Sequence, residues 1–82
     1  MDVAFTKRFL SDVKKLKKDL RVELEKAIEK ILEHPHAGKP LRHSFKGCRS
    51  ARVGKFRIIY MEEKGKIVFV AFEHRKKAYR KW

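Results

Sequence analysis

The side chains best suited to act on a phosphate group gather in the second half of this 82-residue chain. Arg52, Arg57 and His74 are followed closely by Arg75 and Tyr79. A guanidinium can hold two phosphate oxygens at once, and an imidazole or a phenol beside it can transfer a proton. The set therefore suits phosphate binding with acid–base chemistry. The alternative is structural, because arginines are common on exposed sheet faces and a tyrosine of this kind can simply pack.

Three predicted strands would carry this set, at residues 49–53, 56–62 and 66–73, with a short turn after each of the first two. Gly54-Lys55 fits a two-residue type II′ turn, because glycine stands at its first central position. Lys64-Gly65 fits the second turn. The nearly continuous apolar run within the third strand is typical of a strand that is covered on both faces.

Alternation along these strands assigns each side chain to one face of the sheet, because residues paired across strands point the same way. The face suited to packing against helices comprises Ala51, Val53, Phe56, Ile58 and Tyr60. The opposite face comprises Cys48, Ser50, Arg52, Arg57, Ile59 and Met61, and continued alternation adds Val68, Val70, Phe72 and His74. Arg52 then pairs with Arg57, and we expect His74 to lie near Arg57.

The first half of the chain predicts the elements that pack on this sheet. Residues 3–5 are a short strand candidate, and Thr6 is suited to cap a helix. A second helix, with Asp19 as its predicted cap, ends before Pro35. A short connection makes the two helices an antiparallel hairpin. The prediction for residues 1–82 is a single α+β domain with an N-terminal strand, a helical hairpin and an antiparallel β meander, the helices lying on one face of the sheet.

The histidines and the single cysteine do not form a pattern for metal binding. His34 and His36 flank a proline at the start of a loop over residues 35–47, and no acidic residues or cysteines gather around them at ligand spacing. Cys48 has no disulfide partner, which fits a reducing compartment and predicts a buried, inert thiol. We expect neither a metal nor another cofactor.

The charge of the chain is strongly unbalanced, with 23 Lys and Arg against 10 Asp and Glu and a formal net charge of +13. Such a surface attracts polyanions, namely RNA, DNA, a ribosome or an acidic protein. A heavily charged thermophilic surface would explain the abundance of charge but not its imbalance. The chain lacks a signal-peptide pattern and any apolar run of the ~20 residues that a membrane span needs, so we expect a soluble, cytoplasmic protein with no membrane partner.

Four stretches of the sequence carry a resemblance to a known family. They are Phe5-Thr-Lys-Arg-Phe-Leu before a lysine-rich helix, Gly38-Lys-Pro-Leu, Arg49-Ser-Ala-Arg-Val-Gly-Lys-Phe-Arg-Ile-Ile-Tyr60 and His74-Arg-Lys-Lys-Ala-Tyr79. Together and in this order they resemble the RelE branch of the RelE/ParE toxin superfamily over essentially the whole chain. The resemblance implies a RelE-like fold and a type II toxin–antitoxin toxin. Such a toxin enters the ribosomal A site and cuts mRNA, without a metal, through attack by the mRNA's own 2′-hydroxyl.

The resemblance also implies roles for individual side chains. Arg57 would clamp the transition-state phosphate, and Arg75 would do the same or help to protonate the leaving 5′-oxygen. Tyr79 would stack on or orient the nucleotide, or take part in proton transfer. His74 is a further candidate acid or base, because an imidazole titrates near neutral pH. Additional RNA or phosphate contacts are assigned to Arg49, Arg52, Lys46 and Lys55.

The chain departs from the RelE pattern at Cys48 and Ser50, where the best-known RelE proteins carry a pair of lysines. Arg49 and Arg52 lie nearby, but alternation points Arg49 to the other face of the sheet. The general base is therefore not assigned, and weak, altered or absent nuclease activity stays open.

The partners implied are the ribosome, its mRNA and a cognate RelB-like antitoxin, whose acidic character would complement the positive charge of this chain. The apolar patch at Ile59, Met61, Val68 and Val70 could accept an amphipathic helix of that antitoxin, or the chain's own tail could cover it.

Two other functions stay open at this point. One is a ParE-like toxin of the same fold that poisons DNA gyrase and performs no nuclease chemistry. Arg75 and Tyr79 argue against it, because such toxins usually lack this C-terminal set. The other is a non-catalytic module that binds RNA or the ribosome through its basic surface alone.

Overall fold

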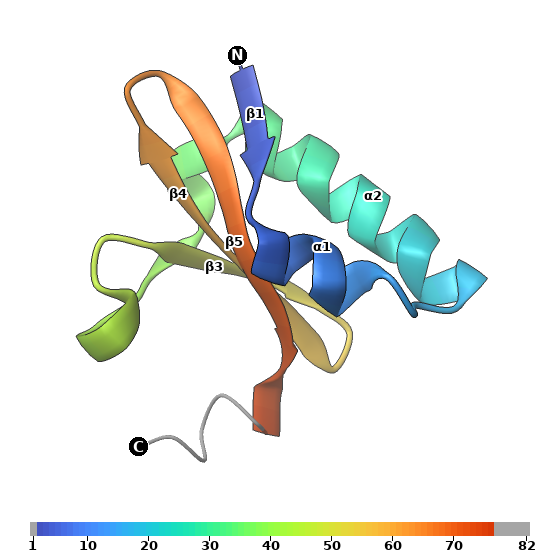
Figure 1. The fold of residues 1–82 in the computed structure, drawn as a ribbon. Helices are drawn as coiled ribbons and strands as arrows, with labels where there is room; N and C mark the ends of the chain where they lie inside the picture. The colour runs from blue at the N-terminus through green and yellow to red at the C-terminus, as the bar shows by residue number, and fades with distance from the viewer. Residues whose placement is uncertain (1, 77–82) are drawn as a thin grey trace.

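A single mixed β-sheet with two helices on one face makes up the fold of the computed structural model, which describes residues 2–76 (Figure 1). The strands are β1 (Asp2–Phe5), β2 (Lys39–Pro40), β3 (Arg49–Val53), β4 (Phe56–Glu63) and β5 (Lys66–His74). The helices are α1 (Lys7–Val13) and α2 (Lys18–Glu33), with single 3-10 turns at Pro35–Ala37 and His43–Phe45. The predicted α+β fold is confirmed. Between residues 2 and 76 no helix has the length and apolar character of a membrane span.

The strand order in the sheet is β1-β5-β4-β3-β2, so the strand that comes last along the chain lies next to the first. Strands β2 to β5 are antiparallel to their neighbours, whereas β1 is parallel to β5. Ile67 and Phe69 on β5 are completely buried, because β5 has a neighbour on both sides and helices over one face. The sequence predicted the first strand but neither its parallel pairing nor the short strand β2.

The caps of the two helices differ from each other. Thr6 caps α1 as expected, since its side-chain oxygen accepts a hydrogen bond of 3.0 Å from the backbone N–H of Phe9. The prediction for Asp19 is wrong: Lys17 is the N-cap of α2, without a side-chain hydrogen bond, and Asp19 lies inside the first turn. A carboxylate in that turn still compensates the positive end of the helix dipole. Helix α2 ends at Glu33, just before Pro35, as predicted.

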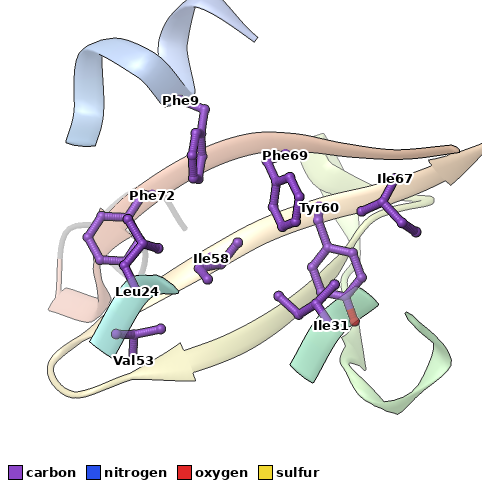
Figure 2. Close-up of a cluster of buried hydrophobic side chains, with 9 residues drawn as sticks. All are labelled: Phe9, Leu24, Ile31, Val53, Ile58, Tyr60, Ile67, Phe69 and Phe72. Carbon is purple, nitrogen blue, oxygen red and sulfur yellow. The ribbon is translucent and has the colours of Figure 1, made fainter. Parts of the chain in front are cut away.

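The main hydrophobic core lies between the two helices and the sheet face below them (Figure 2). Its buried residues are Phe9, Leu24, Ile31, Val53, Ile58, Tyr60, Ile67, Phe69 and Phe72. The aromatic rings are central to it, with the ring of Phe69 5.4 Å from that of Phe5 and 5.6 Å from that of Phe9. The predicted helix-facing set is confirmed, because Val53, Ile58 and Tyr60 are buried there.

The opposite face of the sheet has a smaller apolar cluster, formed by Cys48, Ile59 and Ala71. Leu41 and Phe45, from the loop between β2 and β3, pack against this cluster. Ile59 is completely buried as a result. The centre of the predicted apolar patch is therefore covered by a loop of the chain itself, a cover that the sequence did not indicate.

A β-bulge in β5 changes which side chains share a face. Tyr60 pairs with Phe69 but its neighbour Ile59 pairs with Ala71, so Val70 is an extra residue in β5. Val70 and Ala71 consequently both contact the smaller cluster, and every later residue of β5 changes face. The predicted positions of two of those later residues, Phe72 and His74, are wrong. Phe72 lies in the main core, and His74 pairs with Phe56 instead of approaching Arg57.

Gly38 is held close to the core residue Tyr60. The Tyr60 hydroxyl donates a 2.9 Å hydrogen bond to the carbonyl oxygen of Pro35, and a β-carbon on Gly38 would collide with that hydroxyl. We expect Gly38→Ala to lower the free energy of unfolding by about 1–3 kcal/mol, since the hydroxyl must leave its partner. Urea denaturation measures this loss. In a Tyr60→Phe background the same substitution should be clearly less costly, and an equal cost there would contradict the proposed clash.

Candidate active site

An open cavity of about 880 Å³ lies on the sheet face opposite the helices, under the loop between β2 and β3. Its lining is strongly cationic: the basic side chains are Lys39, Arg42, His43, Arg52, Arg57 and Arg75. The other lining residues are Pro40, Leu41, Phe45 and Ser50, so no carboxylate stands among the described lining residues. A concave surface with this lining attracts anions and offers several donors to one phosphate group.

The turn between β3 and β4 brings two of these arginines together. Arg52 and Arg57 pair directly across the two strands, as the sequence predicted. Gly54 opens the turn with a φ of 57°, a left-handed conformation that glycine adopts without strain. The backbone N–H of Arg75 donates a 3.0 Å hydrogen bond to the carbonyl oxygen of Lys55, which holds Arg75 beside the same turn. Residues from both ends of the meander therefore meet in one cavity.

Arg57 is a closely held cation of the cavity. Its side chain is only 15% exposed, and its Nη2 donates a hydrogen bond of 3.3 Å to Oε1 of Glu73. Its guanidinium carbon lies 6.0 Å from the centre of the Phe45 ring, within cation–π range. Its Nε is buried and has no hydrogen-bond partner among the described residues. A guanidinium that lines the cavity and is held on two sides is suited to receive an anionic oxygen.

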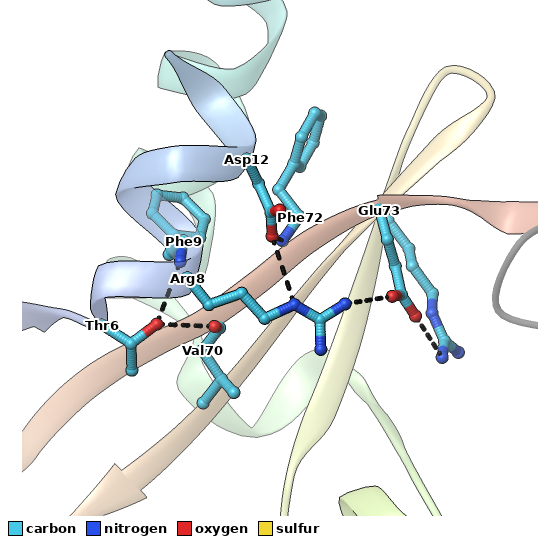
Figure 3. A network of polar contacts seen from close by, with 8 residues as sticks. Thr6, Arg8, Phe9, Asp12, Val70, Phe72 and Glu73 are labelled. Atoms are coloured by element: carbon cyan, nitrogen blue, oxygen red, sulfur yellow. Dashed lines mark hydrogen bonds and ion pairs between the residues drawn. The ribbon is translucent and has the colours of Figure 1, made fainter.

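Glu73 links this site to helix α1 (Figure 3). Its carboxylate is 5% exposed, and its Oε2 accepts a 2.6 Å hydrogen bond from Nη2 of Arg8. The Nε of Arg8 lies 3.6 Å from Asp12, whose carboxylate accepts a 3.0 Å hydrogen bond from the backbone N–H of Phe72. The contacts connect both turns of α1 to the strand that carries Glu73, so the helix holds the carboxylate next to Arg57.

The structure separates the proposed site residues into two groups. Arg52, Arg57 and Arg75 line the cavity, whereas Lys46 and Lys55 are exposed and are not part of its lining. Arg49 points to the other face, as alternation predicted, and donates hydrogen bonds to the carbonyl oxygens of residues 36 and 38. Its observed contacts therefore hold the loop before β2.

Of the two remaining candidates, His74 is not part of the cavity lining. His74 does not face Arg57: its ring meets the ring of Phe56 edge-on at 5.2 Å, and its Nδ1 accepts a 3.2 Å hydrogen bond from the backbone N–H of Lys76. The Val70 bulge causes this change of face. Tyr79 lies outside the described residues.

Sequence reasoning missed several residues of the site. Lys39, Arg42 and His43 were visible as a basic loop, but only the folded loop shows that they line the same cavity as Arg57. His43 has a left-handed backbone with a φ of 59°, which is uncommon for a residue with a side chain. One feature of the sequence could have indicated Glu73 as a site residue: it is a lone carboxylate at the end of a strongly apolar strand.

Cys48 is buried against Ile59 and Ala71, and burial raises the pKa of its thiol above the ordinary value of 9.0. The reactive thiolate is therefore scarcer at neutral pH than in an exposed cysteine. We expect a thiol reagent at pH 8 to label the folded protein at least about a hundredfold more slowly than the protein unfolded in urea. Equal rates in the two states would show that the thiol is accessible, contrary to the structure.

The fold and the cavity define a small basic α+β domain whose open sheet face is equipped to hold a polyanion. The family model described as the ParE toxin of the type II toxin–antitoxin system parDE matches residues 3–79. The chain belongs to this family and is a type II toxin of the RelE/ParE superfamily, as the resemblance indicated. A comparison with curated protein sequences gives no significant match.

Solved structures of toxins have the same fold. The RelBE2 toxin–antitoxin complex of Mycobacterium tuberculosis contains a chain 31% identical to this one, with a TM-score of 0.75 over 90% of this chain and 96% of that one. YafQ of Escherichia coli BL21(DE3) is 21% identical, with a TM-score of 0.78 over 95% and 97% of the two chains. The isolated RelE toxin of Escherichia coli is 22% identical, with a TM-score of 0.75 over 98% and 92%. The predicted RelE-like fold is thereby confirmed.

Proposed function

We propose that this toxin is a metal-independent, ribosome-dependent endoribonuclease that cuts mRNA in the ribosomal A site, in the cytoplasm. The observation that carries the proposal is the cavity in which Arg52, Arg57 and Arg75 converge without a carboxylate in the described lining. Cleavage by the 2′-hydroxyl passes through a crowded, negatively charged phosphate, and preorganised guanidinium groups stabilise that charge. The chain thus supplies from its own side chains the positive charge that this reaction requires.

The proposed reaction has three parts. A base removes the proton of the 2′-hydroxyl, the 2′-oxygen bonds to phosphorus, and the bond from phosphorus to the 5′-oxygen breaks as that oxygen takes up a proton. Arg57 holds the phosphate, and Arg75 holds it too or assists protonation of the leaving oxygen. Tyr79 orients the nucleotide or takes part in proton transfer. The products are a cyclic phosphate end and a free 5′-hydroxyl end.

His43 is the histidine of the described cavity lining, and we assign it the acid or base role instead of His74. An imidazole changes its charge near neutral pH, as a proton-transfer group should. His43→Gln should lower cleavage by about 10²-fold or more, as loss of a general acid or base does. His74→Gln is the matched control, because its ring packs on Phe56. Equal activity of His43→Gln and wild type would remove His43 from the mechanism.

Primer extension on an mRNA under translation tests the nuclease proposal. We expect new ends only on ribosome-bound message, and none when the same RNA is free in buffer with EDTA. A 2′-deoxy nucleotide at the cleaved position should block the reaction, because the attacking group is then absent. Intact message on ribosomes that demonstrably bind the protein would refute the proposal.

DNA gyrase poisoning is the second candidate, favoured by the match to a family model described as ParE. It predicts that the purified protein inhibits supercoiling by gyrase and leaves translated mRNA intact. The two assays therefore give opposite patterns for the two candidates.

We also propose a cognate antitoxin, RelB-like and acidic, as the protein partner. The similar structure from Mycobacterium tuberculosis is a toxin–antitoxin complex. The net charge of +13 on this chain favours association with an acidic partner, and such association weakens as salt is added.

A further inference from the structure

We propose that Glu73 and Arg8 form a positioning pair: Glu73 fixes the guanidinium of Arg57, and Arg8 keeps Glu73 from neutralising it. The inference rests on the proposed function, in which Arg57 holds the reacting phosphate. Neither Glu73 nor Arg8 lines the cavity, so both would act through Arg57 and without contacting the RNA.

The two contacts of the carboxylate are unequal. Oε2 of Glu73 lies 2.6 Å from Nη2 of Arg8, whereas Oε1 lies 3.3 Å from Nη2 of Arg57. The first distance is that of a strong charge-assisted hydrogen bond, and the second lies at the weak end of the range. The stronger contact therefore belongs to Arg8, which is 44% exposed and stands outside the cavity.

The unequal sharing leaves Arg57 oriented but available. Arg57 contacts only one oxygen of Glu73, and its side chain lines the cavity. A two-point arginine–carboxylate pair would occupy donors that a phosphate needs. By occupying the second oxygen of Glu73, Arg8 prevents such a pair. The ring of Phe45, about 6 Å from both guanidinium carbons, limits how far either can move.

The arrangement predicts opposite binding effects for two substitutions. In Glu73→Gln the anchor loses its charge, so Arg57 attracts anions more strongly but is held less well. We expect an about threefold tighter complex with a fluorescent single-stranded oligodeoxynucleotide, which cannot be cut, and an about 10- to 100-fold lower kcat. In Arg8→Gln the carboxylate is free to pair with Arg57 at two points. We expect both weaker oligodeoxynucleotide binding and a lower kcat.

Matched controls separate these effects from a simple change of net charge. Glu62→Gln removes a negative charge from the same hairpin, at a carboxylate that is 39% exposed and contacts His36. Arg21→Gln removes a positive charge from the exposed side of α2. At one fixed salt concentration, we expect Glu73→Gln to bind the oligodeoxynucleotide about twofold more tightly than Glu62→Gln. We expect Arg8→Gln to bind it about twofold more weakly than Arg21→Gln.

For Glu73→Gln, a merely structural role would lower binding and turnover together, whereas the positioning role predicts tighter binding with lower turnover. An unchanged or higher kcat for Glu73→Gln would overturn the proposal, because Arg57 would then not depend on its anchor. If Glu73→Gln does not fold, Arg8→Gln decides the question, since exposed Arg8 can be replaced with little cost to the core. Affinity equal to that of Arg21→Gln would then overturn it.

These experiments distinguish failure of the positioning role from failure of the proposed function. If the wild-type protein cuts no RNA, the nuclease proposal fails, but the oligodeoxynucleotide affinities still test the pair. NMR of the Arg57 guanidinium gives a second readout without catalysis. We expect slower rotation of that group in Arg8→Gln and faster rotation in Glu73→Gln than in wild type. Identical rotation in all three proteins would overturn the positioning role.

Discussion

Replacing Arg57 by alanine is expected to lower the cleavage rate on ribosome-bound mRNA by about 10²- to 10³-fold, the usual cost of losing a preorganised donor at a developing negative charge. The side chain is 15% exposed and is held by Glu73 and Phe45, so it is already positioned before the substrate binds. Single-turnover primer extension gives the rate directly.

Two further variants serve as controls for Arg57→Ala. Arg57→Lys keeps the charge but loses the planar pair of donors, so it should recover only part of the rate. Arg21→Ala, on the exposed side of α2, should behave as wild type. Folding should survive Arg57→Ala, because Arg8 still neutralises the buried Glu73. Wild-type cleavage by folded Arg57→Ala would remove this arginine from the site.

Phe69→Ala is expected to have the largest effect on stability. Phe69 is completely buried on β5 and lies in ring contact with Phe5, Phe9 and Tyr60. Removal of a buried phenylalanine ring costs about 3–5 kcal/mol, through lost burial and the cavity left behind. A domain of this size has only about 5–15 kcal/mol in total, so we expect a largely or wholly unfolded protein at 37 °C.

Circular dichroism during thermal and urea unfolding measures this effect. Leu10→Ala on α1 is the control, because that side chain is 53% exposed and should change stability little. A Phe69→Ala protein with nearly the wild-type unfolding midpoint would show that the aromatic cluster is not the main support of the sheet.

Much of the fold could be predicted from local patterns. Gly54-Lys55 fixes the turn, and with it the pairing of Arg52 with Arg57 that the structure confirms. Alternation then assigned the faces correctly as far as Val70. The sequence also indicated Thr6 as a helix cap, because a hydroxyl oxygen just before an amphipathic stretch can accept a hydrogen bond from a free backbone N–H in the first turn of the helix.

The bulge at Val70 could not be predicted, because the residues that hydrogen-bond to it are distant in the sequence. The Thr6 hydroxyl donates a 2.6 Å hydrogen bond to the carbonyl oxygen of Val70, and Asp12 accepts one from the backbone N–H of Phe72. Both contacts come from α1 and its cap, about sixty residues earlier. The resulting change of face brings Glu73, in place of His74, next to Arg57.

The candidate site was therefore only partly predictable. Arg57 follows from strand pairing, and a backbone hydrogen bond to the neighbouring turn positions Arg75. By contrast, Lys39, Arg42 and His43 belong to the cavity only because the loop folds back over the sheet, with Leu41 and Phe45 packed on its smaller apolar cluster. This packing depends on the assembled sheet. No repeat or spacing within the loop sequence indicates it.

The position of β5 in the sheet has a consequence for the order in which the protein can assemble. The strand lies between β1 and β4, yet Asp2 pairs with Lys66, 64 residues later in the chain. While the protein is being synthesised, β1 and both helices leave the ribosome without the strand on which they pack. Such distant pairing makes folding slow, because the long loop must close before its contacts form. The arginine cavity, whose lining includes Arg75 at the end of β5, is therefore completed only after β5 has emerged, so the nascent chain has no formed cavity until then.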